Sequence, residues 1–101
     1  MQPRRRELEA LRLEVLDRLA EGHRSLGDVH AWSAVARRIV VAEPWREEVQ
    51  CELMTCYARQ GRHSLALRQF QACVVALRSA LGATPSEDTM ALVDRIRRRD
   101  V

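Results

Sequence analysis

Three cysteines and three histidines are the side chains of this sequence best suited to metal binding or nucleophilic chemistry. Cys51 and Cys56 are five residues apart, which turns them about 140° from each other around a helix. That separation disfavours one shared zinc ion, and the sequence has no Cys-x-x-Cys pair. We interpret Cys56 and Cys73 as buried core thiols and predict no metal site.

The histidines, His23, His30 and His63, lie at or near the predicted ends of helices. A nucleophilic site needs a histidine that an acid orients beside a serine or cysteine, and neither the order nor the helical facing of these residues suggests one. The sequence also lacks a Gly-rich phosphate loop and a paired-carboxylate motif. We therefore predict that the chain is not an enzyme and holds no cofactor.

The elements that carry these residues repeat along the chain. Gly27 and Gly61 lie 34 residues apart, and each follows one amphipathic segment and precedes the next. That interval is the period of the tetratricopeptide repeat, a helix–turn–helix unit. Pro44-Trp45 follows Gly27 by 17 residues, half a period, where a second helix should end.

The apolar periodicity predicts an all-α chain, a tetratricopeptide-like stack of antiparallel helix pairs with about five helices. The expected helices cover about residues 5–26, 29–43, 45–60, 63–81 and 87–99. We predict one domain over residues 1–101, with a first repeat at about 8–44, a second at about 45–81 and a capping helix at about 86–99.

The charge pattern predicts a solvated surface. All seventeen basic residues are arginine, and the formal net charge is only +3. Most arginines alternate with acids at helical spacing, which favours solvated helix faces over contacts with nucleic acid. The longest stretch without a charge, Gln69–Leu77, is about half of the ~20 apolar residues that cross a bilayer. We expect a cytoplasmic protein that does not bind membranes.

Several stretches of the sequence are similar to one bacterial family. They are LMTCYARQGR at residues 53–62, ALRQF at 66–70, Pro44-Trp45-Arg46-Glu47, and a tail with Leu77, Leu81-Gly82, Pro85-Ser86, Thr89, Leu92 and Ile96. From about Leu8 to Ile96 the chain resembles the bacterial transcriptional activator domain, which occurs in the SARP-type antibiotic regulatory proteins. Within that family, the chain looks like the C-terminal part of the domain.

The resemblance implies a tetratricopeptide-like domain that follows a winged-helix DNA-binding domain in the same polypeptide. DNA contact would then be made only through a domain absent from this chain, and the expected partners are proteins. The resemblance leads us to expect an interaction or oligomerisation module of a bacterial transcription regulator. The alternative is a peptide- or ligand-binding tetratricopeptide scaffold of a signalling ATPase regulator.

Two surfaces are candidates for partner binding. A groove on the concave side of the repeats would suit a basic partner segment, because its first helix is acidic and it has no Lys or Asn to clamp a carboxylate; a merely solvated face is the alternative. A self-association edge would lie where an end helix leaves an apolar stripe uncovered. Trp32 belongs to this edge in our prediction, because repeats normally keep a small residue at its position. The predicted groove consists of Glu14, Asp17, Glu21, Arg24, Glu48, Cys51, Thr55 and Arg59, and the predicted edge of Leu8, Leu11, Val15 and Trp32.

Overall fold

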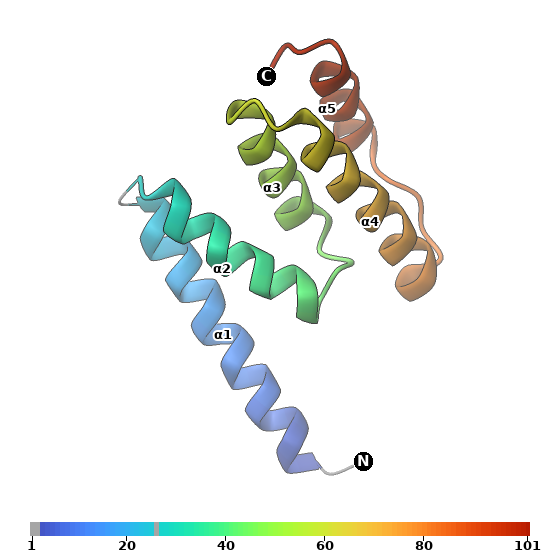
Figure 1. Ribbon diagram of the computed structural model, residues 1–101. Coiled ribbons are helices and arrows are strands. Elements are labelled where there is room, and N and C mark those ends of the chain that lie inside the picture. Colours follow the sequence, from blue (N-terminus) through green and yellow to red (C-terminus); the bar gives the residue numbers. More distant parts are fainter. Residues whose placement is uncertain (1–2, 26) are drawn as a thin grey trace. The chain divides into compact units, whose positions relative to one another are not determined.

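The computed structural model describes residues 3–25 and 27–101, and the side chains of residues 7–23 and 27–101. These ranges hold five α-helices and no strand (Figure 1), so the prediction of an all-α chain is confirmed. The chain divides into two compact units, one ending at Ile39 and one running from Val40 to Val101. The helices are α1 (Pro3–Ser25), α2 (Val29–Ala42), α3 (Glu47–Arg59), α4 (His63–Leu81) and α5 (Glu87–Arg97).

In the first unit, a tight turn reverses the chain between α1 and α2. Gly27 has a φ of 71°, a left-handed conformation that glycine adopts without the steric cost of a Cβ. The Asp28 amide donates to the His23 carbonyl (2.9 Å), which satisfies an acceptor at the end of α1. The Asp28 carboxylate accepts from the Ala31 amide (3.0 Å), so Asp28 caps α2.

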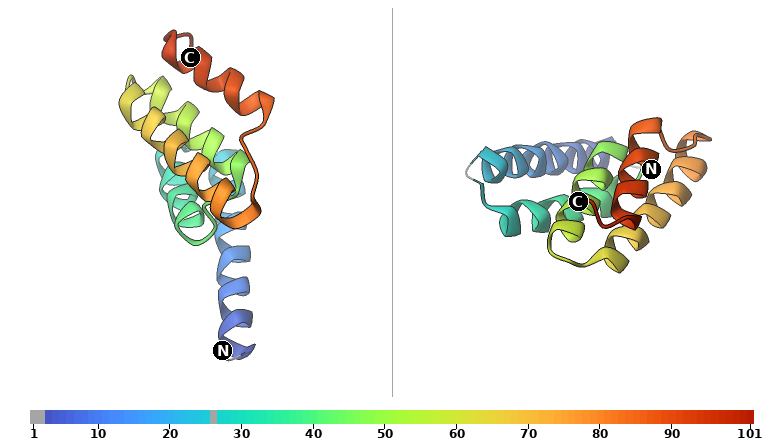
Figure 2. Two further views of the ribbon diagram at one scale, coloured as in Figure 1. Left: turned by 90° about the vertical axis from the view of Figure 1, so that its right-hand side faces the viewer. Right: turned by 90° about the horizontal axis from the view of Figure 1, so that it is seen from above.

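From this turn α1 and α2 run in opposite directions (Figure 2). Leu16 and Ala20 of α1 are buried, four residues apart on one face of the helix. On α2 the buried positions recur at helical spacing, with Val35, Ala36 and Ile39 among them. The first unit thus has one buried face on each helix, as expected for a helical hairpin.

In the second unit, α3 and α4 form an antiparallel hairpin around Gly61, whose φ of 76° again requires glycine. The Arg62 amide donates to the Tyr57 carbonyl (2.8 Å) and the Gly61 amide to the Ala58 carbonyl (3.0 Å). These bonds satisfy the last carbonyls of α3 and end the helix. The positions of Gly27 and Gly61 are therefore sufficient to place both hairpin turns from the sequence.

A buried polar pair ties α3 to its neighbours. The Gln50 side chain donates through Nε2 to the Pro44 carbonyl (2.8 Å) and accepts through Oε1 from Gln69 of α4. Because buried amides are costly without partners, these bonds compensate for burying Gln50. They hold the turn before α3, and the middle of α4, against the same side chain.

Helix α5 packs against both α3 and α4. Gly82 ends α4 in a left-handed conformation, and Ser86 caps α5 by accepting from the Thr89 amide (3.3 Å). The acidic first turn of α5, Glu87 and Asp88, lies beside the positive end of its helix dipole.

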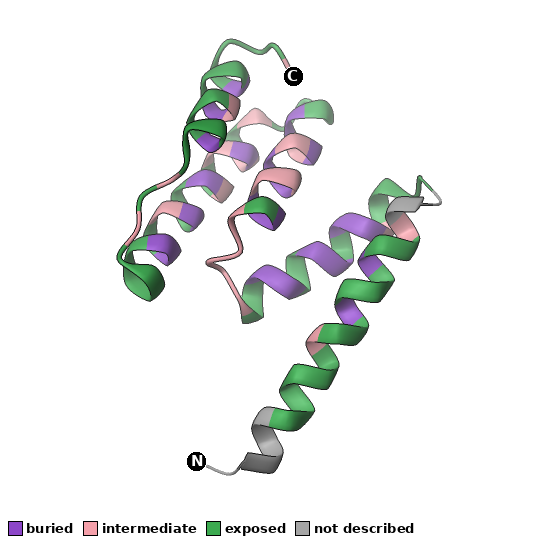
Figure 3. Ribbon diagram, turned by 180° about the vertical axis from the view of Figure 1, so that it is seen from behind, coloured by how far each residue is buried: buried purple, intermediate pink, exposed green. Residues whose placement is uncertain are grey.

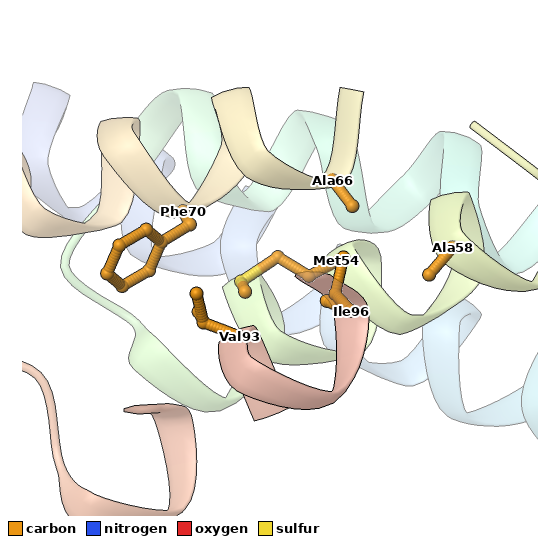
Figure 4. Packing of buried hydrophobic residues seen from close by; sticks show 6 residues of the cluster. All are labelled: Met54, Ala58, Ala66, Phe70, Val93 and Ile96. Atoms are coloured by element: carbon orange, nitrogen blue, oxygen red, sulfur yellow. The ribbon is translucent and has the colours of Figure 1, made fainter. Parts of the chain in front are cut away.

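The core of the second unit combines side chains of all three helices. Met54 of α3, Phe70 of α4 and Val93 of α5 point toward one another (Figure 4). Small residues at Ala58 and Ala66 take part in the same cluster, where they let α3 and α4 approach closely. The cluster consists of Met54, Ala58, Ala66, Phe70, Val93 and Ile96.

The helix ends that differ from the predicted bounds include the start of α3 and the end of α5. Helix α3 begins at Glu47 instead of Trp45, because the Arg46 amide donates to the Glu43 carbonyl (3.1 Å) and closes a turn around Pro44-Trp45. Helix α5 ends at Arg97 instead of residue 99. Arg99 takes the left-handed conformation there (φ 59°), and the Asp100 amide bonds back to the Arg95 carbonyl (2.8 Å).

Candidate interaction surface

Four large apolar side chains lie exposed along α1, a helix that is mostly exposed in Figure 3. Their exposed fractions are high for such residues, and we call this set the α1 stripe. It consists of Leu8 (59%), Leu11 (56%), Val15 (53%) and Leu19 (45%). A contiguous apolar row of this kind on a polar surface is typical of an interaction site.

Helical geometry gathers these side chains on one face. At 100° per residue, the α1 stripe falls within an arc of about 80° around the helix axis. Leu16 and Ala20, which are buried, lie on a separate arc that begins about 60° away. Helix α1 therefore has two apolar faces, and only one of them is covered in the described part of the chain.

The 34-residue period relates each position of α1 to an equivalent position of α3. Val15 corresponds to Val49 of α3, and Leu19 corresponds to Leu53. Val49 and Leu53 are buried, whereas Val15 and Leu19 are exposed. The same repeat positions are thus packed in one helix and uncovered in the other, which is expected for the end helix of a repeat array.

Trp32, the fourth residue of the predicted self-association edge, is only 8% exposed. Its α2 neighbour Ser33 is also buried and donates to the His30 carbonyl (3.1 Å). Trp32 therefore differs from Leu8, Leu11 and Val15, which offer exposed apolar surface. Leu19, which is exposed, is not part of the predicted edge.

The predicted groove residues of α1 carry exposed charges. Glu14, Asp17 and Glu21 are all exposed. Glu14 lies about 160° around the helix axis from the buried Leu16, whereas Asp17 lies about 100° from it. The side chain of Arg24 lies outside the described side chains.

The predicted groove residues of α3 have two different environments. Glu48 and Arg59 are exposed. Cys51 and Thr55 are half-buried and already make hydrogen bonds: the Cys51 thiol lies 3.1 Å from the Thr89 hydroxyl of α5, and Thr55 donates to the Cys51 carbonyl (2.9 Å). Cys51 and Thr55, the central groove residues of α3, thus already make hydrogen bonds within the second unit.

Glu47 anchors the start of α5 to α3, a feature that sequence reasoning missed. Its carboxylate accepts from the Ser86 amide (2.8 Å) and from the Thr89 hydroxyl. Burial raises the pKa of the Glu47 carboxyl, but the hydrogen bonds from Thr89 and Ser86 outweigh that effect and leave the pKa below its ordinary value. The ionised form of Glu47 therefore stabilises the contact between α3 and α5.

The cysteines are poorly placed for chemistry. Cys56 and Cys73 are buried, as predicted, and all three thiols are free. Burial raises the pKa of Cys51, and nearby carboxylates, Glu47 among them, raise it further. Burial likewise raises the pKa of Cys73 to about 11. Since the thiolate is the nucleophile, these shifts disfavour reactivity.

The other side chains that could bind a metal ion lie apart from one another. Within residues 3–25 and 27–101, no three His, Cys, Asp or Glu side chains come together to hold a metal ion. His63 begins α4, where its Nδ1 lies 3.3 Å from Nη1 of Arg99. Its Nε2 is buried without a hydrogen-bond partner among the described residues. His23 and His30 flank the turn between α1 and α2.

Comparison with known proteins gives one family. The sequence model of the bacterial transcriptional activator domain matches residues 1–97. No curated protein and no solved structure matches the chain. None of the helices in the described part of the chain is both long and apolar enough to span a membrane.

Proposed function

This chain belongs to the bacterial transcriptional activator domain family, and we propose that it is a protein-interaction and oligomerisation module of a transcription regulator. In this role it works by packing one helix face against another protein, in the cytoplasm and without cofactor or catalysis. DNA is read by a domain outside this chain, which the module positions or connects to the transcription machinery.

The observation that carries the proposal is the α1 stripe. Val15 and Leu19 are exposed at positions whose counterparts, Val49 and Leu53, are buried. Covering such side chains contributes roughly 25 cal/mol for each Å² of apolar surface removed from water. An uncovered packing face therefore favours association with another protein surface.

The α3 part of the predicted groove supports binding less well. Cys51 and Thr55 are half-buried and hydrogen-bonded within the second unit, which leaves mainly Glu48 and Arg59 available on that helix. We therefore place the interaction on the α1 stripe and not in the groove. A peptide scaffold would need its central groove positions free to meet a ligand.

Hydrogen exchange of the whole chain at low and high concentration tests this function, for example at about 20 µM and about 1 mM, a range that detects weak association. We expect the amides of α1 to exchange more slowly at the higher concentration, while the amides of α4 stay unchanged. Unchanged exchange throughout α1 would count against the oligomerisation module.

A double variant, Asp17→Lys with Glu21→Lys, separates the edge from the groove. These substitutions reverse the acidic face of α1 and leave the α1 stripe intact. We expect concentration-dependent protection of α1 to persist in this variant. Its loss would instead support the groove as the binding surface.

A further inference from the structure

The α1 stripe follows a heptad pattern. With Leu8 at position a, Leu11 falls at d and Val15 at the next a, while Leu19 widens the seam at e. Arg18 occupies the next d position and ends the apolar row. From Leu8 to Val15 the seam is about 10 Å long at 1.5 Å per residue.

Charges of opposite sign flank the two sides of this seam. Glu7 and Glu14 occupy successive g positions, and Arg12 occupies the e position between them. All three side chains are exposed. In coiled coils, residues at e and g border the apolar seam and set the choice and the orientation of the partner helix.

We propose that the α1 stripe binds the α1 stripe of a second copy of this chain, with the two helices parallel and in register. This inference rests on the proposed function and specifies its partner and geometry. Each of Leu8, Leu11 and Val15 would then meet its own counterpart across the seam.

The charges complement each other in this arrangement. In a parallel pair, a residue at g faces the residue five positions later, at e of the other helix. Glu7 therefore faces Arg12 of the second copy, and the two-fold symmetry repeats the pair on the other side. Opposite charges thus border both sides of the apolar seam.

An antiparallel pair would bring like charges together. In that orientation g faces g and e faces e, so that Glu14 meets a glutamate of the second copy and Arg12 meets its own counterpart. Like charges in such positions destabilise a helix pair. The charges that border the seam from Leu8 to Val15 thus favour the parallel orientation of two identical helices.

The seam is short, and its length sets the strength of the contact. Stable isolated coiled coils usually extend over three or more heptads, whereas this one covers about two turns. We expect a weak, reversible dimer whose dissociation constant lies roughly between 10 µM and 1 mM. A contact of this strength responds to changes in the local concentration of the regulator.

Charge exchange between Glu7 and Arg12 tests the register. The substitution Glu7→Arg sets an arginine against Arg12 of the second copy, and Arg12→Glu sets a glutamate against Glu7 of the second copy. We expect either substitution alone to lower the association constant by about four- to thirtyfold in sedimentation equilibrium. In an equimolar mixture, the two arginines of the Glu7→Arg variant face the two glutamates of the Arg12→Glu variant, one pair on each side of the seam, so mixing should restore association.

The double variant, E7R with R12E, restores an opposite-charge pair on both sides of the seam and should self-associate like the native chain. Asp94→Arg and Arg68→Glu serve as controls, because they make comparable charge changes at positions of α5 and α4 outside the α1 stripe. Circular dichroism of each variant verifies that the helices are retained.

Three results would overturn the parallel pairing. In the first, the native chain associates, and Glu7→Arg and Arg12→Glu associate with the same constant as the native chain. In the second, Glu7→Arg associates more strongly than the native chain. Either of these leaves the oligomerisation module intact, since the chain still self-associates. In the third, the native chain remains monomeric up to about 1 mM while a different protein protects α1, which rejects the second copy as partner.

Discussion

The Thr89 hydroxyl of α5 lies 3.1 Å from the Cys51 thiol of α3, and it donates its one proton to the Glu47 carboxylate. Because that proton is already used, the Cys51 thiol is the donor in the contact with Thr89. Thr89 is buried and so connects α5 to two positions of α3, one helical turn apart. This contact is the polar anchor of the second unit.

Thr89→Val keeps the shape of the side chain and removes the donor to Glu47. We expect the free energy of unfolding to fall by about 1–3 kcal/mol, since the carboxylate loses a hydrogen bond in a partly buried site. Denaturant unfolding monitored by circular dichroism measures the change. Thr84→Val, at a loop position between α4 and α5, is the matched control. Equal losses in the two variants would show that the contact contributes nothing specific.

Glu47 should make stability depend on pH in the acidic range. Its native pKa lies below the ordinary value of 4.5, because the hydrogen bonds from Thr89 and Ser86 outweigh the effect of burial. The stabilisation is therefore fully present above the unfolded pKa and is lost as the pH falls through the native pKa. We expect the stability difference between the native chain and Glu47→Gln to be constant near neutral pH and to shrink below about pH 4.5. A difference that grows on acidification would contradict this assignment.

Two glycines should respond oppositely to alanine. Gly22 lies inside α1 with open space where a Cβ would be placed, so Gly22→Ala should raise the free energy of unfolding by about 0.5–1 kcal/mol. Gly61 also has open space where a Cβ would be placed, but its φ of 76° is unfavourable for any residue with a Cβ. Gly61→Ala should therefore lower the free energy of unfolding by about 1–2 kcal/mol. Thermal or denaturant unfolding compares both. The same sign for the two variants would reject the conformational argument.

Cysteine alkylation tests the raised thiol pKa values. We expect iodoacetamide to modify Cys51 more slowly than a free thiol such as N-acetylcysteine near neutral pH, because burial keeps the thiol protonated. Cys73, with a pKa of about 11 and a fully buried side chain, should react only after unfolding. Mass spectrometry of timed samples identifies the modified residue. Faster labelling of Cys51 than of the free thiol would show an activated cysteine instead.

The sequence alone is sufficient for the features that depend on neighbouring residues. Gly27 and Gly61 mark the hairpin turns, and Asp28 and Ser86 mark helix starts, because each satisfies backbone groups within a few residues of itself. The apolar periodicity locates five helices for the same reason. The left-handed conformation of Arg99 is not foreseen, since that conformation usually requires glycine.

Features that join distant residues could not be derived in this way. The contact between Glu47 and Thr89 spans 42 positions and depends on how α5 packs against α3. Cys51 is half-buried because of the same packing of α5 against α3. The assignment of Cys51 to an open groove stays a prediction. Trp32 is buried, although its size at a small-residue position suggests either a splayed first hairpin or an outward side chain.

Sedimentation velocity of the native chain beside Leu11→Gln tests the central claim, that the exposed stripe of α1 is an interaction surface. Leu11 is 56% exposed, so the substitution removes apolar surface from the seam without opening a cavity in a core. Because the seam is short, one polar amide at its centre is sufficient to interrupt it. We expect the weight-average sedimentation coefficient of the native chain to rise with concentration and that of Leu11→Gln to stay at the monomer value. Identical concentration dependence in the two proteins would contradict the account.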